Sequence, residues 1–345
     1  MKRGTDIDAA VAVLRAGGLV AFPTETVYGL GADASRDDAA AKIFAVKGRP
    51  RAHPLIVHLA PGARLEDWAV DVPESARTLA AAAWPGPLTI ILKRGPRVSL
   101  ATTGGAETVG LRVPAHPLAQ QLLAAFGGGV AAPSANRFGA VSPTTAEHVA
   151  ADLGDDVDYI LDGGPCDVGV ESTIVDLSRG APVLLRPGGM PREAIEAIVG
   201  PLADADAGAP AAPGTLASHY APKAEVIAVE PHEVPAAVMA AATELGSRGE
   251  PDAAVSPAGR MRRATLVRER IAVLAPAGAF AAWGPLAARA CPLPDDLAGM
   301  ARGLYAALRD LDALGVDVVI AALPPAVGLG EAVGDRLRRA AGPRK

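Results

Sequence analysis

The sequence predicts an α/β protein in which a twisted open-sheet domain is followed by a linker and a small Rossmann-like domain. Three observations support this fold class. The chain has 345 residues, more than a single domain usually contains. Short apolar runs alternate with helix-like segments along most of its length. From Gly200 to Ala221 the sequence is rich in Ala, Pro, Gly and Asp and has no periodic apolar face, as expected of a linker.

The first part of the chain, up to about Val199, predicts short strands between helices. Asp6 can cap a helix that ends at Gly17-Gly18, and Asp37 to Val46 is a second helix candidate. Thr144 and Glu147 have the spacing of a capping box, which predicts a helix after Ser142-Pro143. The expected strands are Leu19 to Phe22, Leu55 to Leu59, Leu88 to Leu92, Val109 to Val113, Val130 to Ala132, Tyr159 to Leu161, Thr173 to Leu177 and Val183 to Leu185. The segment from Pro23 to Gly31 is expected to be a turn-rich loop.

The second part, from about Glu225, predicts a small doubly wound domain. Strand-like runs alternate with helices there, and Gly246 to Arg263 is expected to be a mobile loop. The expected elements are strands at Val226 to Val229, Ile271 to Leu274 and Val318 to Ala321, and helices at Asp295 to Leu314 and Gly330 to Ala341. The predicted domain limits are 1–203, 204–223 for the linker and 224–345.

The composition argues against nucleic-acid binding by base stacking or by a broad basic face, and against a disulfide framework or a thiolate metal site. Half of the residues are hydrophobic but only 3% are aromatic, so the cores should be aliphatic and base-stacking platforms scarce. A formal net charge of -5 argues against a broad basic face for nucleic acid. Cys166 and Cys291 form no CxxC pair, which predicts neither a disulfide framework nor a thiolate metal site. We expect a cytoplasmic protein without a signal peptide or membrane span.

Two pairs of polar residues lie where apolar elements end. Lys47 and Arg49 follow a predicted helix and could both face one anion, although basic residues also end helices for electrostatic reasons alone. Ser134 and Asn136 follow a predicted strand, where α/β sheets often form a binding crevice, but a simple turn is equally compatible. Together the pairs favour a polyanion site. The sequence has neither a P-loop nor a GxGxxG fingerprint.

Two ionisable residues interrupt apolar strands. A buried Arg112 would need an anionic partner, which Glu171 or a ligand carboxylate could supply. His58 is either satisfied by the backbone or functional. No Ser-His-Asp arrangement, His-rich metal cluster or activated Cys is evident, so the chemistry expected is positioning and charge stabilisation rather than covalent catalysis.

Taken together, these segments resemble the threonylcarbamoyl-AMP synthase family in its long form, which has a YrdC-like catalytic domain and an extra C-terminal domain. The Lys-x-Arg and Ser-x-Asn signature of the family matches Lys47, Arg49, Ser134 and Asn136. The other matching segments are Pro23 to Gly31, Pro54 to Leu59, Trp84 to Thr89, Gly110 to Pro117, Ser142 to Thr144, Glu171 to Asp176, Leu185 to Gly188 and His219 to Pro222.

The resemblance implies a nucleotidyltransferase that makes L-threonylcarbamoyladenylate from L-threonine, bicarbonate and ATP and releases pyrophosphate. The product would serve the threonylcarbamoyladenosine modification of tRNA beside the anticodon. It implies that ATP is bound by Arg49, His53, Thr108, Ser134, Ser142, Arg186 and Tyr220, and that threonine is bound by Thr26, His58, Arg112, the Ala132 backbone and Ser172. Catalytic roles are implied for Lys47, Arg49, Ser134 and Asn136.

The resemblance also implies partners and leaves alternatives. Mg²⁺ is expected to be carried by ATP, because the sequence offers no carboxylate cage. Hand-over of the product to a threonylcarbamoyl transferase complex and a weak tRNA contact are further expectations. The alternatives are carbamoyl transfer, as in hydrogenase-maturation proteins that contain a YrdC-like domain, a non-catalytic RNA-binding module and a purely structural α/β protein.

Overall fold

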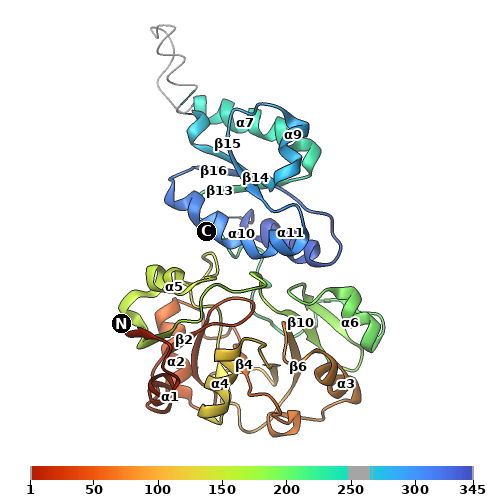
Figure 1. Ribbon diagram of the computed structural model, residues 1–345. Coiled ribbons are helices and arrows are strands. Elements are labelled where there is room, and N and C mark those ends of the chain that lie inside the picture. The colour runs from red at the N-terminus through yellow and green to blue at the C-terminus, as the bar shows by residue number, and fades with distance from the viewer. Residues whose placement is uncertain (1, 248–264, 266, 344–345) are drawn as a thin grey trace. The chain divides into compact units, whose positions relative to one another are not determined.

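The computed structural model describes residues 2–247, 265 and 267–343, and Figure 1 shows its course. The chain divides into two compact units, Met1–Leu216 and Ala217–Lys345. Both are α/β units, which confirms the predicted fold class. Among the described residues, no helix combines the length and the apolar character needed to cross a bilayer.

The first unit is built on one large twisted sheet that contains twelve strands of the described chain. The strand order is β1-β9-β2-β3-β8-β4-β7-β6-β10-β11-β12, with β5 paired to β6, and the sheet mixes parallel and antiparallel pairs. The strands are β1 Lys2–Gly4, β2 Val20–Phe22, β3 Gly29–Asp33, β4 Ile56–His58, β5 Ala69–Val70, β6 Leu88–Arg94, β7 Thr108–Arg112, β8 Val130–Ala131, β9 Tyr159–Leu161, β10 Thr173–Asp176, β11 Val183–Arg186 and β12 Ala203–Asp204.

Helices cover the two faces of this sheet unequally. The helices are α1 Ile7–Arg15, α2 Asp37–Lys47, α3 Glu74–Ala83, α4 Pro117–Phe126, α5 Ala146–Leu153 and α6 Arg192–Val199, with short 3-10 turns η1 Leu65–Asp67 and η2 Gly154–Asp156. Side chains of α2, α3, α5 and α6 form the main aliphatic core with one face. On the other face, α1 and α4 pack over β2, β3, β8 and β9.

The rest of that second face, over β4, β7, β6, β10 and β11, is covered by none of the described helices of the first unit. Its apolar part is a small cluster formed by Ile56, Ile91, Ile174, Val183 and Leu185. Ala209 and Ala212, from the segment that follows β12, pack against this cluster. Because side chains alternate between the faces of a strand, His58 and Arg112 lie on the same face as Ile56. This uncovered half-face therefore carries apolar residues and polar residues side by side.

Local sequence signals explain several element boundaries. Asp6 caps α1 by accepting a 3.0 Å hydrogen bond from the Ala9 amide, as predicted. Helix α2 ends at Gly48, whose φ of 63° needs a residue without a side chain. The capping-box prediction was wrong by one residue: Thr145, not Thr144, is the N-cap of α5 and accepts from the His148 amide at 3.3 Å. The extended backbone at Thr145 brings its hydroxyl over the first turn.

The predicted loop from Pro23 to Gly31 is shorter than expected, because its last three residues begin β3. Glycine permits this strand to pack closely. A Cβ atom on Gly31 would lie 2.8 Å from Val130 Cγ1 and 2.9 Å from Phe22 Cε1. A glycine-rich segment has weak strand propensity, so the neighbouring strands rather than the local sequence determine the structure here.

The second unit has a four-stranded parallel sheet in the order β13-β16-β14-β15. Helix α7 packs on one face, and α10 and α11 lie on the other (Figure 1). The strands and helices are β13 Glu225–Val229, η3 Pro231–Glu233, α7 Val234–Ser247, β14 Ile271–Pro276, η4 Ala277–Ala279, α9 Phe280–Trp283, β15 Arg289–Leu293, α10 Leu297–Ala313, β16 Val318–Ala322 and α11 Leu329–Ala340. Most of the expected loop from Gly246 to Arg263 lies outside the described residues; its first two residues end α7.

The N-cap of α5 gives a stability prediction. Replacing Thr145 with Ala should lower the free energy of unfolding of the first unit by about 1 kcal/mol, because an amide of the first turn loses its acceptor. Thr145→Ser retains the acceptor and should cost much less. Urea denaturation followed by circular dichroism compares the two variants. Equal losses for Ala and Ser would contradict the capping role.

Candidate active site

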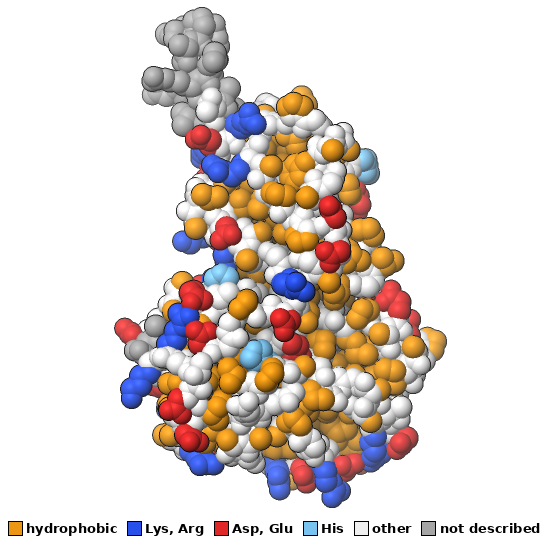
Figure 2. All heavy atoms as spheres, in the orientation of Figure 1, with side chains coloured by type: hydrophobic (Ala, Val, Ile, Leu, Met, Phe, Trp, Pro, Cys, Tyr) orange, Lys and Arg blue, Asp and Glu red, His pale blue; other side chains and the backbone are white. Residues whose placement is uncertain are grey.

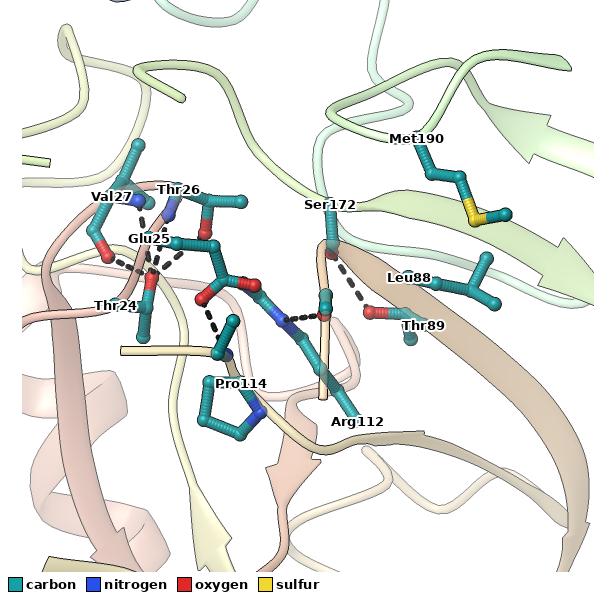
Figure 3. Close-up of polar contacts among 12 residues, drawn as sticks. Thr24, Glu25, Thr26, Val27, Leu88, Thr89, Arg112, Pro114, Ser172 and Met190 are labelled. Atoms are coloured by element: carbon teal, nitrogen blue, oxygen red, sulfur yellow. Dashed lines mark hydrogen bonds and ion pairs between the residues drawn. The ribbon is translucent and has the colours of Figure 1, made fainter. Parts of the chain in front are cut away.

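Polar side chains gather at one end of the uncovered half-face. His58 and Arg112 are register partners on the parallel strands β4 and β7. Ile90 pairs with Leu111, so Thr89 on β6 comes beside Arg112. The Thr89 and Ser172 hydroxyl oxygens are 2.8 Å apart, and Arg186 donates to the Ser172 carbonyl at 2.7 Å. A continuous polar strip therefore runs from β4 across β7 and β6 to the start of β10. Figure 3 shows its members Arg112, Thr89 and Ser172.

Arg112 is paired with Glu25, not with Glu171. Glu25 Oε1 lies 2.8 Å from Arg112 Nη2, and both residues are about 95% buried. The other carboxylate oxygen of Glu25 accepts a 3.0 Å hydrogen bond from the Ala115 amide, and Arg112 Nε donates to the Gly86 carbonyl at 3.4 Å. Glu171 instead accepts a 2.6 Å hydrogen bond from the Ser142 hydroxyl. Of the two expected partners, Glu171 was thus wrong, because a loop from far earlier in the chain supplies a carboxylate; the ligand carboxylate stays a prediction.

A tight turn presents Glu25 to the strip. The Thr24 hydroxyl donates to the Val27 carbonyl at 2.6 Å and accepts from the amides of Thr26 and Val27 at 3.2 Å. Because its single proton is used in this way, the Thr26 hydroxyl is the donor in the 2.8 Å contact between the two threonines. The turn thus places Glu25 and Thr26 side by side, with Glu25 directed toward Arg112 (Figure 3).

His58 is buried and neutral at physiological pH. Burial, reinforced by the neighbouring Arg112 charge, lowers the pKa of its imidazole to about 3. Its ring meets the ring of Phe22 edge to face, with 5.7 Å between centroids. Its Nδ1 has no hydrogen-bond partner among the described residues. A neutral imidazole beside a guanidinium can offer a hydrogen bond to a ligand without adding charge.

A second cluster forms where α2 meets the segment after β8. Lys47 is 3% exposed, and its Nζ donates to the Ser134 carbonyl at 2.6 Å, the Asn136 carbonyl at 2.5 Å and the Asn136 side-chain oxygen at 3.4 Å. The Asn136 amide group in turn donates to the Arg137 and Ala140 carbonyls at 3.0 and 2.7 Å. Lys47 and Asn136 thus brace this segment, which we call the Ser134–Ala140 loop.

Burial, together with the charge of Arg49, holds the pKa of Lys47 well below its usual range. The three oxygens around Nζ favour the ammonium form, because each can accept one of its three N–H bonds. The cation is therefore retained by hydrogen bonding at a place where its desolvation is costly.

Arg49 lies beside the same loop. It donates to the His53 and Pro54 carbonyls at 3.4 and 3.0 Å, and its guanidinium lies 5.7 Å from the centre of the Phe138 ring. His53 contacts the same ring edge to face at 5.5 Å. The structure thus brings Arg49 and His53 together with Lys47, Ser134 and Asn136. Their individual roles stay predictions.

The remaining predicted residues occupy distinct places. Thr108 is the first residue of β7 and Arg112 is the last. Thr108 therefore lies at the end of this strand that is farther from the polar strip. The amide of Ala132, just after β8, donates to the Ile56 carbonyl at 2.8 Å. Ser142 is fully buried against Glu171. Tyr220 belongs to the second unit, where its ring is stacked on Tyr305 and lies 5.0 Å from the Arg336 guanidinium carbon.

Sequence reasoning missed Glu25 as a functional candidate. It lies inside the Pro23 to Gly31 segment that was singled out, and a carboxylate in an otherwise uncharged loop was the available signal. Nowhere in the described ranges do three or more His, Cys, Asp or Glu side chains gather in a way that could hold a metal ion.

The family models and curated relatives place this two-domain α/β chain among enzymes that make an adenylate. Residues 12–188 match the family described as Telomere recombination, which groups Sua5, YciO and YrdC. Residues 190–342 match the family described as the C-terminal domain of threonylcarbamoyl-AMP synthase. The chain belongs to the threonylcarbamoyl-AMP synthase family, which confirms the resemblance.

Curated relatives and solved structures agree over nearly the whole chain. It is 41% identical to threonylcarbamoyl-AMP synthase of Pyrococcus abyssi, covering 98% of this chain and 94% of the relative. It is 42% identical to that of Bacillus subtilis, covering 98% and 93%. The solved structure of Pyrococcus abyssi Sua5 in complex with L-threonine superposes with a TM-score of 0.82 at 39% identity, covering 99% of this chain and 96% of that one.

The neutral His58 predicts how stability depends on pH. The pKa of His58 in the folded protein, about 3, is below its ordinary value of 6.5, so the unfolded chain binds the extra proton between these values. Stability should therefore fall as pH drops from about 6.5 toward 3. His58→Gln, compared with wild type by thermal melting across this range, should lose less stability on acidification. A wild-type slope unchanged by the substitution would contradict the assignment.

The brace on the Ser134–Ala140 loop predicts energetic coupling between Lys47 and Asn136. Because both hold the same loop, the losses in Lys47→Ala and Asn136→Ala should not add in the double variant; the coupling should be about 0.5–3 kcal/mol. Denaturation of the four proteins of this cycle measures it. Fully additive losses would mean that Lys47 acts independently of the loop.

Proposed function

We propose that the protein synthesises L-threonylcarbamoyladenylate from L-threonine, bicarbonate and ATP and releases pyrophosphate. The product would be used for the threonylcarbamoyladenosine modification of tRNA next to the anticodon. Membership of the family supports this proposal, as does the L-threonine in the solved structure of the Pyrococcus abyssi relative. The observation that carries it is the buried polar strip, where a guanidinium, a neutral imidazole and hydroxyls converge on an otherwise apolar sheet face.

The proposed threonine subsite is the strip itself. Arg112 would bind the amino acid carboxylate as a charge-assisted pair, and His58, Ser172, Thr26 and the Ala132 backbone would supply uncharged polar contacts. Burial strengthens such contacts, because water competes less in a site of low dielectric. A site that hydrogen-bonds the side-chain hydroxyl of threonine would reject amino acids that lack one.

The proposed reaction has two steps. In the first, the α-ammonium group and bicarbonate give a carbamate, with loss of one water molecule and one proton. In the second, a carbamate oxygen forms a bond to the α-phosphorus of ATP, and the bond from that phosphorus to the bridging oxygen of pyrophosphate breaks. No protein nucleophile is required in either step. The protein contributes orientation and charge stabilisation.

The proposed ATP subsite includes the second cluster. Arg49, Ser134 and the braced loop would face the phosphates, with Lys47 and Asn136 fixing the loop. The nucleotide ligands proposed are Arg49, His53, Thr108, Ser134, Ser142, Arg186 and Tyr220. We take Mg²⁺ to arrive as the ATP complex.

We also retain the proposed domain limits of 1–203, 204–223 and 224–345, a cytoplasmic location where tRNA is modified, hand-over of the product to a transferase complex and a weak contact with tRNA. The alternative of a non-catalytic RNA-binding module gains no support from the visible surface. Figure 2 shows Lys and Arg interspersed with Asp and Glu rather than gathered in one basic field.

The decisive experiment is pyrophosphate release from ATP by the purified protein, with and without L-threonine and bicarbonate, with the adenylate identified by mass. We expect release that depends on both co-substrates. ATP binding without any release under these conditions would overturn the proposed activity.

The signature cations predict a specific loss of activity. Arg49→Ala should lower adenylate synthesis by ~100-fold, the usual scale for losing a group that stabilises transition-state charge. Lys47→Ala should lower it by ~100-fold as well, because the Ser134–Ala140 loop beside the proposed phosphate subsite would lose its brace. Arg51→Ala is the matched control, because Arg51 is a nearby exposed arginine outside the cluster. Wild-type rates in Arg49→Ala, or an equal loss in Arg51→Ala, would contradict this assignment.

A further inference from the structure

One buried carboxylate oxygen in the polar strip has unused hydrogen-bonding capacity. Glu25 is 6% exposed, and its Oε2 is engaged by the Ala115 amide. Oε1 forms the ion pair with Arg112 Nη2, but neither atom makes a hydrogen bond of acceptable geometry within the described part of the chain. A buried carboxylate oxygen left in this condition is costly, so a ligand donor would be strongly favoured there.

The charges around this atom define which ligand fits. Arg112 contributes one positive charge and Glu25 one negative charge, while His58 is neutral and the neighbouring Thr24, Thr26, Thr89 and Ser172 are uncharged. The next cation along the strip, Arg186, is hydrogen-bonded to Ser172 rather than to Glu25. A ligand that carried only a carboxylate would bind Arg112 but would leave a second buried negative charge beside Glu25. Such a charge is unfavourable without a counterion. A ligand with both charges satisfies Arg112 and Glu25 together.

We propose that Glu25 binds the α-ammonium group of the amino acid substrate while Arg112 binds its carboxylate. The inference rests on the proposed function and adds a residue to its threonine subsite. In an α-amino acid the two charged groups are attached to one carbon, so adjacent protein charges of opposite sign are the complementary arrangement. Glu25 and Arg112 are adjacent, with 2.8 Å between their facing atoms, and their side chains are directed toward one another (Figure 3).

The proposed contact between Glu25 and the α-ammonium group distinguishes the amino acid from its carbamate. Conversion of the ammonium group removes its positive charge and adds a carboxylate, with release of water and one proton. Glu25 then faces a negative group instead of a positive one, and attraction becomes repulsion. The carbamate end is thereby disfavoured at Glu25, whereas the carboxylate of the amino acid remains on Arg112. Glu25 thus selects the unreacted amine without holding the intermediate.

The test compares L-threonine with its 2-hydroxy analogue, 2,3-dihydroxybutanoate of matching stereochemistry, which has no ammonium group. Isothermal titration calorimetry should show that the wild-type protein prefers threonine by ~10-fold or more, the scale of a hydrogen bond to a charged group. Glu25→Gln keeps an oxygen for the Ala115 amide but loses the charge, so the preference should largely disappear. Glu147→Gln, an exposed carboxylate variant, is the control and should keep it.

The possible results separate the role of Glu25 from the proposed function. Equal wild-type affinity for the two ligands, or an undiminished preference in a folded Glu25→Gln, would overturn the role of Glu25 while leaving threonine as substrate. Equal weakening of both ligands in Glu25→Gln would show a structural role and would also overturn it. If this variant does not fold by thermal melting, the wild-type comparison decides alone. Failure of the wild-type protein to bind threonine would overturn the proposed function together with this inference.

Discussion

A guanidinium on a strand of an aliphatic sheet must have a carboxylate, and this requirement organises the site. Arg112 ends β7 and is almost fully buried, so its charge would be prohibitive without a partner. Glu25 meets the requirement from a loop that follows β2, and its second oxygen accepts the Ala115 amide just beyond β7. One side chain therefore ties the loop, the strand and the segment that leaves it. The hydroxyl contacts of Thr24 hold the loop in the shape that this pairing needs.

The uneven distribution of helices over the sheet makes room for this site. Helices α1 and α4 cover β2, β3, β8 and β9 on one face, whereas the same face over β4, β7, β6, β10 and β11 has none of the first unit's described helices on it. Gly110 lies in the middle of that region, and a Cβ there would come within 3.1 to 3.4 Å of Ile91, Thr89 and Ile56. Because Gly110 has no side chain, no group projects from the half-face between its polar and its apolar residues. The uncovered area of the sheet leaves room for the proposed threonine subsite.

The sequence predicted elements with strong local signals and missed those that depend on the tertiary context. Apolar runs such as β6 and β16 were predicted because several consecutive β-branched or leucine residues favour buried strands. The glycine-rich β3 and the two-residue β12 have no such signal, and pairing with neighbours creates them. The site shows the same division. The two signature pairs were recognised locally, but Glu25 could not be matched to Arg112, because nothing in the sequence states which distant carboxylate faces a buried cation.

The two cations of the signature, Lys47 and Arg49, have different structural roles, and the geometry of each place explains why one is a lysine and the other an arginine. Lys47 has three N–H donors in a tetrahedral arrangement and meets three oxygens of the Ser134–Ala140 loop. The planar fork of arginine could not reach three acceptors converging on one point. Arg49 instead extends along carbonyls and over an aromatic ring, the contacts that suit a flat delocalised cation. The two cations of Lys-x-Arg are therefore not interchangeable: one fixes the loop from behind, and the other lies alongside it at the proposed phosphate subsite.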